Sequence, residues 1–170
     1  MTMTPRLRKL GLTAHIVTSV GWLGAAAAYA GLVVAALRSM DAQVVRAAYL
    51  AIEPITSFAI VPLAFASLLT GLVQSLGTPW GLVRHYWVLC KVLLAVAATA
   101  VLLENTRTVS DMANVAAATQ SPDIGGLQGQ LVHAGGGMLV LLLTTVLAVY
   151  KPRGMTHYGW RKQHDQRTVA

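Results

Sequence analysis

Four apolar stretches, each long enough to cross a lipid bilayer as a helix, constrain this chain more than any other feature of its sequence. A transmembrane helix needs about 20 mostly apolar residues, and here 55% of 170 residues are apolar and only 11% are charged. Such a composition leaves little polar surface to face water. The sequence therefore predicts an all-α fold, a bundle of four transmembrane helices in a single integral membrane domain. The expected spans are roughly residues 10–37, 54–76, 86–103 and 127–150.

Prolines and polar residues set the expected ends of these helices. Pro54 is placed at the start of the second helix, where a proline is harmless, and Pro62 is expected to kink that helix. Residues 104–126 are the expected outer loop, with a short amphipathic helix in their alanine-rich middle. This short helix is expected to lie on the membrane surface, outside the bundle.

Basic residues gather at the connections on one predicted side of the membrane. Ten of the thirteen Lys and Arg residues flank the N-terminus, the second connection and the C-terminal tail, residues 151–170. The positive-inside bias of short loops predicts that both termini are cytoplasmic and that the protein lies in the cell's inner membrane. Because a basic tail beside a bilayer is attracted to anionic lipids, the net charge of +7 does not indicate a nucleic-acid partner. The ten residues are Arg6, Arg8, Lys9, Arg84, Lys91, Lys151, Arg153, Arg161, Lys162 and Arg167.

The first span carries two different faces at helical spacing. One face is polar and aromatic and is expected to look into the bundle, because an imidazole facing hydrocarbon would lack hydrogen-bond partners. The other face is made of small residues, which let a second helix approach closely in a membrane. It is expected to pack against a neighbouring helix, a second copy of the chain or a partner protein. The faces are His15, Ser19, Trp22, Ala26 and Tyr29, and Gly21, Gly24, Ala28 and Gly31.

Lys91 is a formal charge well within a predicted span, and it is expected to meet His15. Both residues lie about 7 Å from the cytoplasmic end of their helices, at a rise of about 1.5 Å per residue. Trp87 stands one turn before Lys91 and shares its face. His133 begins a helix on the outer side, so it is expected in a separate environment. The sequence thus predicts one polar site near the cytoplasmic side.

The stretches "AHIVTSVGWLG" (14–24) and "YWVLCKVLLA" (86–95) resemble the first and third helices of a family of small bacterial four-helix membrane proteins without an assigned activity. More distantly, they resemble copper-resistance-protein-D-like proteins and the membrane-bound protoporphyrinogen oxidase. In that oxidase the matching histidine and lysine are associated with haem and activity. The resemblance implies a haem site at His15 and Lys91, with Trp22 and Trp87 beside them and His15 as the axial ligand.

Two functional hypotheses follow from the sequence. The first is a cofactor-free structural, assembly or accessory subunit that interacts with a partner in the membrane. The alternative is a b-type haem- or porphyrin-binding redox protein that uses His15 and Lys91. Copper handling requires soft Met or Cys ligands, but the six methionines are scattered and Cys90 is the single cysteine. Nucleotide-binding and zinc-protease motifs are absent, so the sequence does not decide whether the chain is an enzyme.

Overall fold

The computed structural model describes residues 3–78, 81–119, 126–152 and 154–168, and these residues form helices with no strand among them. Four helical segments are long and apolar enough to cross a membrane, which confirms the predicted all-α, four-transmembrane bundle. The elements are α1 (Pro5–Arg38), α2 (Ala42–Ile55), the π-helical segment η1 (Thr56–Ile60), α3 (Val61–Gly77), α4 (Tyr86–Ala118), α5 (Leu127–Tyr150) and α6 (His157–Thr168).

The second span begins at Ala42, twelve residues before the predicted start, and runs through α2, η1 and α3 to Gly77. The Asp41 side chain caps its first turn by accepting a hydrogen bond from the Gln43 amide at 2.8 Å. Pro54 therefore lies inside the helix, and its predicted position at the start is wrong. The π-helical segment η1 falls between Pro54 and Pro62, where the missing proline amides interrupt the regular hydrogen-bond ladder.

The third span extends to Ala118, well beyond its predicted end near residue 103. The alanine-rich stretch is helical, but it continues α4, so the expected separate surface helix is wrong. Met112 and Ala116 are buried in a small core with Tyr49 of α2. Packing against α2 thus stabilises a part of α4 that is too polar to be recognised as a membrane span.

The polar and aromatic face of α1 looks into the bundle, as its spacing predicts. Trp22, Ala26 and Tyr29 are buried at 4%, 9% and 5% exposure. Trp22 and Tyr29 belong to the main core, together with residues of α2, α3, α4 and α5. This face therefore fixes how α1 is turned relative to the other helices. It directs Ser19, one turn before Trp22, and His15, two turns before it, inward.

The small-residue face of α1 has a different outcome. At Gly21 an added Cβ would lie 3.3 Å from Leu63, so this glycine does allow α3 to approach closely. At Gly24 and Gly31 an added Cβ would meet no atom within 4 Å, and Ala28 is exposed. The prediction that this face packs against another helix is therefore wrong within the described part of the chain, except at Gly21.

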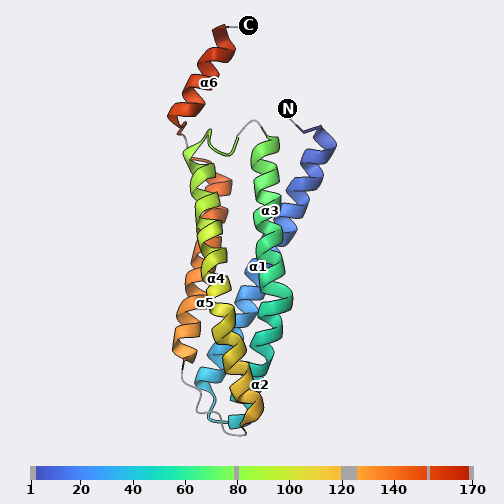
Figure 1. Ribbon diagram of the computed structural model, residues 1–170, viewed down its shortest axis with the longest axis vertical. Helices are drawn as coiled ribbons and strands as arrows, with labels where there is room; N and C mark the ends of the chain where they lie inside the picture. Colours follow the sequence, from blue (N-terminus) through green and yellow to red (C-terminus); the bar gives the residue numbers. More distant parts are fainter. Residues whose placement is uncertain (1–2, 79–80, 120–125, 153, 169–170) are drawn as a thin grey trace.

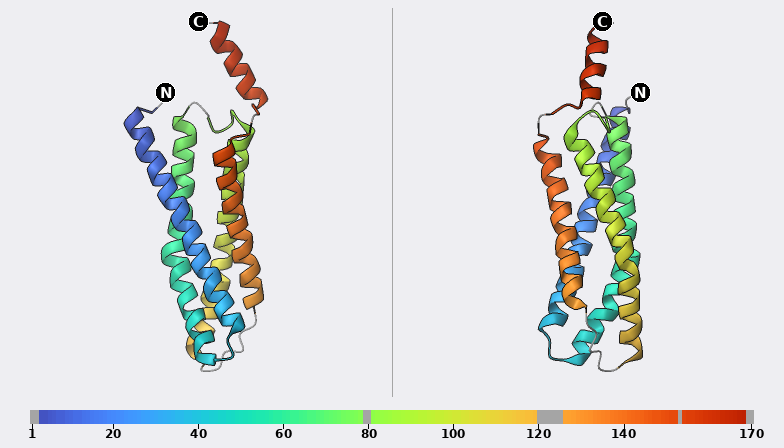
Figure 2. Two further views of the ribbon diagram at one scale, coloured as in Figure 1. Left: turned by 180° about the vertical axis from the view of Figure 1, so that it is seen from behind. Right: turned by 60° about the vertical axis from the view of Figure 1, so that its left-hand side comes forward.

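The helices form an elongated bundle in which α1 contacts α3 and α5, while α4 contacts α2, α3 and α5 (Figure 1). The N-terminus, the α3–α4 connection and α6 lie at one end, called here the terminal end. Toward that end α1 and α3 diverge from α4 and α5 (Figure 2). The segment before α6 is tied to the α3–α4 connection by a hydrogen bond from the Thr156 amide to the Arg84 carbonyl at 3.1 Å.

Candidate functional site

A cleft of about 670 Å³ opens between the α1/α3 pair and the α4/α5 pair. Arg8, Thr78 and Lys151 line its outer part, which places its mouth at the terminal end, and Trp22 and Leu141 line its inner part. Its wall is mostly apolar, and its volume falls in the range of about 300–1,000 Å³ that is usual for small-molecule sites. The divergence of the helix pairs at the terminal end thus creates a space large enough for a ligand.

His15 lines this cleft from α1, and α3 holds its ring in place. Nδ1 lies 3.1 Å from the Ser67 carbonyl oxygen and 3.2 Å from the Thr70 hydroxyl. Thr70 donates its own proton to the carbonyl of Ala66, at 2.6 Å. Because a carbonyl only accepts, the arrangement places the imidazole proton on Nδ1 and leaves the lone pair on Nε2. His15 therefore presents a nitrogen that can act as an acceptor or a metal ligand.

The surroundings of the His15 ring form a polar seam between α1 and α3. Ser19 and Ser67 share a hydrogen bond of 2.8 Å between their hydroxyls. A Cβ added at Gly71 would stand 3.0 Å from Cε1 of His15, so the ring lies directly on this glycine. The sequence did not lead us to predict that Ser67, Thr70 and Gly71 contact His15. The signal that could have indicated it is the pair Ser67 and Thr70, two polar residues three positions apart in an apolar helix.

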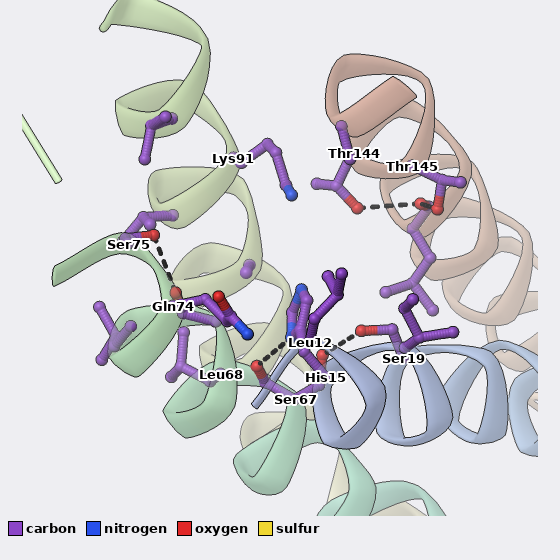
Figure 3. Close-up of a pocket in the computed structure, with 18 of the residues that line it drawn as sticks. Leu12, His15, Ser19, Ser67, Leu68, Gln74, Ser75, Lys91, Thr144 and Thr145 are labelled. Atoms are coloured by element: carbon purple, nitrogen blue, oxygen red, sulfur yellow. Dashed lines mark hydrogen bonds between the residues drawn. The ribbon is translucent and has the colours of Figure 1, made fainter. Parts of the chain in front are cut away.

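Lys91 lines the cleft from α4, opposite His15. Its ammonium lies 5.9 Å from the centroid of the Trp87 ring, within the range of a cation–π interaction. Lys91 and His15 point toward one another across the cleft (Figure 3). The structure thus brings His15 and Lys91 together, as their shared depth predicted.

All four residues that the sequence singled out for cofactor binding line this one cleft: His15, Trp22, Trp87 and Lys91. Trp22 is buried at its inner part, whereas Trp87 lies nearer the mouth. His133 does not line the cleft and interacts with the backbone of Val101. It therefore lies in a separate environment, and the binding role of the four residues stays a prediction.

In the described part of the chain, no three His, Cys, Asp or Glu side chains lie close enough together to hold a metal ion. A bare ion in the cleft would have His15 as its one strong protein donor. Haem is different, because the porphyrin supplies the equatorial nitrogens and the protein needs to add only an axial ligand. Among metal-containing groups, the donor set suits haem.

Comparisons of the chain with protein-family models, with curated proteins and with solved structures gave no match.

Proposed function

We propose that this multi-pass membrane protein binds a b-type haem, or a porphyrin of the same shape, in the cleft, with Nε2 of His15 as the axial nitrogen. The observation that carries the proposal is the hydrogen bond of 3.1 Å between His15 Nδ1 and the Ser67 carbonyl, in a ring that faces the cleft. Histidines that bind metals almost always donate their other ring proton to an acceptor of this kind. The bond fixes the tautomer that an iron atom requires.

The remaining wall suits a flat, apolar ligand. Trp22 and Trp87 supply aromatic surface, and Val88, Val92 and Leu141 supply aliphatic surface. Ligand sites are usually mostly apolar, with a few polar groups that fix the orientation of the ligand. A haem bound here would supply electron-transfer chemistry at its iron, whose potential depends on the axial ligand and on burial. The role of the protein would be to bind, orient and shield it.

Titration of the purified protein with haem in an uncharged detergent tests this proposal. The wild type should develop a shifted Soret band and bind one haem. His15→Ala should lose that shift and bind at least about tenfold more weakly, since removing even a supporting partner of a ligand costs about 10–100-fold.

His133→Ala is the matched control, because it removes the same side chain outside the cleft. It should titrate like the wild type. A His15→Ala protein that binds haem with unchanged spectrum and affinity would show that His15 is not the ligand. The absence of haem binding in the wild type would refute the proposal itself.

A second candidate function is that of an accessory or assembly subunit, favoured by the exposed part of the small-residue face on α1. Gly24, Ala28 and Gly31 are exposed, and the glycines have open space around them. Such a face allows close helix approach from outside the chain. Energy transfer between labelled copies in vesicles should fall for Gly24→Leu and stay unchanged for Gly136→Leu, an equally open glycine on α5. Equal values for both variants would count against self-association through this face.

A further inference from the structure

The cleft is open along one side, between α1 and α5. These helices are joined in their deeper parts, where the Tyr29 hydroxyl of α1 donates a hydrogen bond to Gln130 of α5 at 2.5 Å. Toward the terminal end they separate (Figure 2). The lining residues that the structure describes on α3 and α4 are buried or half-buried, whereas the exposed ones lie on α1, on α5 or directly after α5. The cleft therefore has a lateral opening between α1 and α5, called here the window.

The rim of the window is apolar below the mouth of the cleft. Leu12, Ile16 and Val20 form its α1 side at intervals of four residues, and each of them is at least half exposed. Val149, which is largely exposed, and Thr145 form its α5 side. The Thr145 hydroxyl donates to a backbone carbonyl of its own helix at 2.8 Å, so its polar group already has a partner. The rim therefore offers hydrocarbon surface both to the cleft and to the surroundings of the bundle.

The window lies within the membrane-crossing part of the chain. Both α1 and α5 are long and apolar enough to span a bilayer. Since α1 has 34 residues and is about 51 Å long, a hydrocarbon core of about 30 Å centred on it begins about 10 Å from Pro5. Leu12 lies at about that depth, and Val20 lies about 12 Å deeper. The window thus connects the cleft with the interior of the bilayer, separately from the polar mouth.

The walls behind the window favour an apolar ligand over water. The hydroxyls of Ser19 and Ser67 bond to each other at 2.8 Å, and the Thr144 hydroxyl donates to a carbonyl of its own helix at 2.9 Å. These polar groups have partners within the protein, whereas a buried water needs about two to four polar partners. An apolar molecule gains instead from leaving contact with water and covering surfaces such as Trp22. The window and the space behind it therefore suit the same class of molecule.

We propose that the cleft takes its ligand from the bilayer, through the window, and that this ligand is a lipid-soluble molecule with a flat apolar body. The proposal rests on the proposed function in one respect, that the cleft is a ligand site, and it does not require iron. A tetrapyrrole belongs to this class because most of its ring surface is hydrocarbon. The molecule moves sideways between α1 and α5 until its body lies against Trp22, without passing through the water at the terminal end.

Brominated lipids test whether the bilayer reaches the cleft. Bromine quenches tryptophan fluorescence at close range, and Trp22 is buried within the protein but lines the cleft. In the parent protein for this test, Trp80, Trp87 and Trp160 are changed to Phe, so that Trp22 is the remaining tryptophan. It is placed in neutral phosphatidylcholine vesicles with plain or dibrominated acyl chains. The brominated chains should quench Trp22, because they enter the cleft through the window.

Phenylalanines on the rim should close this route. The rim variant Val20→Phe/Val149→Phe narrows the window from both sides and should lose most of the quenching of Trp22. Val17→Phe/Val146→Phe is the matched control, because both valines are exposed on the same two helices but do not line the cleft. The control should be quenched as strongly as the parent protein. Equal quenching of the rim and control variants, or no quenching of the parent protein, would show that the bilayer does not reach the cleft.

Protoporphyrin IX dimethyl ester, an uncharged and metal-free ring compound, tests the uptake of a ligand. It is added to the protein vesicles, where it dissolves in the bilayer, and energy transfer from Trp22 to the porphyrin follows its binding. The rim variant should take up the ester at least about fivefold more slowly than the control, because a ring that overfills an apolar space raises the barrier by the usual cost of overpacking. Slower uptake after Thr78→Phe at the mouth, with a normal rate in the rim variant, would place the entrance at the mouth and overturn the proposal.

The outcomes separate this proposal from that of haem binding. Protection of Trp22 from brominated chains by the rim phenylalanines, in a protein that gives no haem spectrum, supports entry from the bilayer and refutes the haem proposal. Equal rates of ester uptake in the rim and control variants, or no uptake of the ester by the parent protein, overturn entry from the bilayer, even in a protein whose His15 binds haem.

Discussion

Gln130 is the residue at which the energetics of this bundle can be tested most sharply. Its side chain is 4% exposed on α5 and joins three helices. Its Oε1 accepts hydrogen bonds from the Tyr29 hydroxyl of α1 at 2.5 Å and from the Asn105 amide of α4 at 2.8 Å. Its Nε2 donates to Asn105 Oδ1 at 3.2 Å. Gln130→Leu keeps the approximate shape of the side chain and removes all of these bonds.

Two estimates bracket the cost of Gln130→Leu. Interhelical hydrogen bonds in membrane proteins contribute about 0.6 kcal/mol each on average, so three lost bonds amount to about 2 kcal/mol. A buried polar group left without a partner costs about 1–3 kcal/mol, and the substitution would leave both Tyr29 and Asn105 without Gln130. Because Tyr29 and Asn105 can partly pair with each other, the upper estimate of the total cost is about 4 kcal/mol. We expect a loss of about 2–4 kcal/mol in the free energy of unfolding.

Tyr29→Phe removes a single donor and leaves Gln130 bonded to Asn105. It should cost about 0.5–1.5 kcal/mol. Gln128→Leu is the control, because Gln128 is an exposed residue of the same helix. It should cost close to nothing. The double variant Tyr29→Phe/Gln130→Leu should be less destabilised than the two single changes added together, because the residues share one bond.

Reversible unfolding in mixed micelles, followed by tryptophan fluorescence, measures all four variants. The order of destabilisation should be Gln130→Leu, then Tyr29→Phe, then Gln128→Leu. If Tyr29→Phe costs as much as Gln130→Leu, or if Gln128→Leu costs as much as either, the three-helix network does not stabilise the bundle as argued.

Two further predictions concern packing and topology. Gly71→Leu should weaken haem binding and lower thermostability, because a Cβ at this position would lie 3.0 Å from Cε1 of His15 and the larger side chain would displace the ring. Gly24→Leu should leave both properties unchanged in monodisperse protein, because the space around Gly24 is open. Equal effects of the two substitutions would contradict the assigned packing of α1. Reporters fused at the C-terminus should report the cytoplasm, and reporters inserted at residues 39–41 should report the outside, in agreement with the basic residues at the terminal end; the reverse result would invert the proposed orientation.

Hydropathy was sufficient to predict the four spans but not the ends of the helices. A bilayer requires an apolar length, so the membrane-crossing part of each helix is visible in the sequence. The start of α2 and the last fifteen residues of α4 are more polar, and they are helical because Tyr49 packs against Met112 and Ala116. Contacts between distant segments do not appear in the hydropathy of either one.

The candidate site was predictable where helical periodicity and depth decide it. His15, Trp22 and Lys91 were predicted to face one site, and they line one cleft. The anchoring of His15 by Ser67 was not predictable, because it depends on the register between α1 and α3. The same limit explains the small-residue face: periodicity identifies a face, but it does not identify the helix that covers it.

The absorption spectrum of the protein purified in mild detergent, without added haem, tests most directly the claim that His15 presents a ligand nitrogen to a bound porphyrin. The wild type should show a Soret band, and His15→Ala prepared in the same way should lose or shift it. A wild type with a featureless visible region that gives no shifted Soret band after haem is added would contradict the claim.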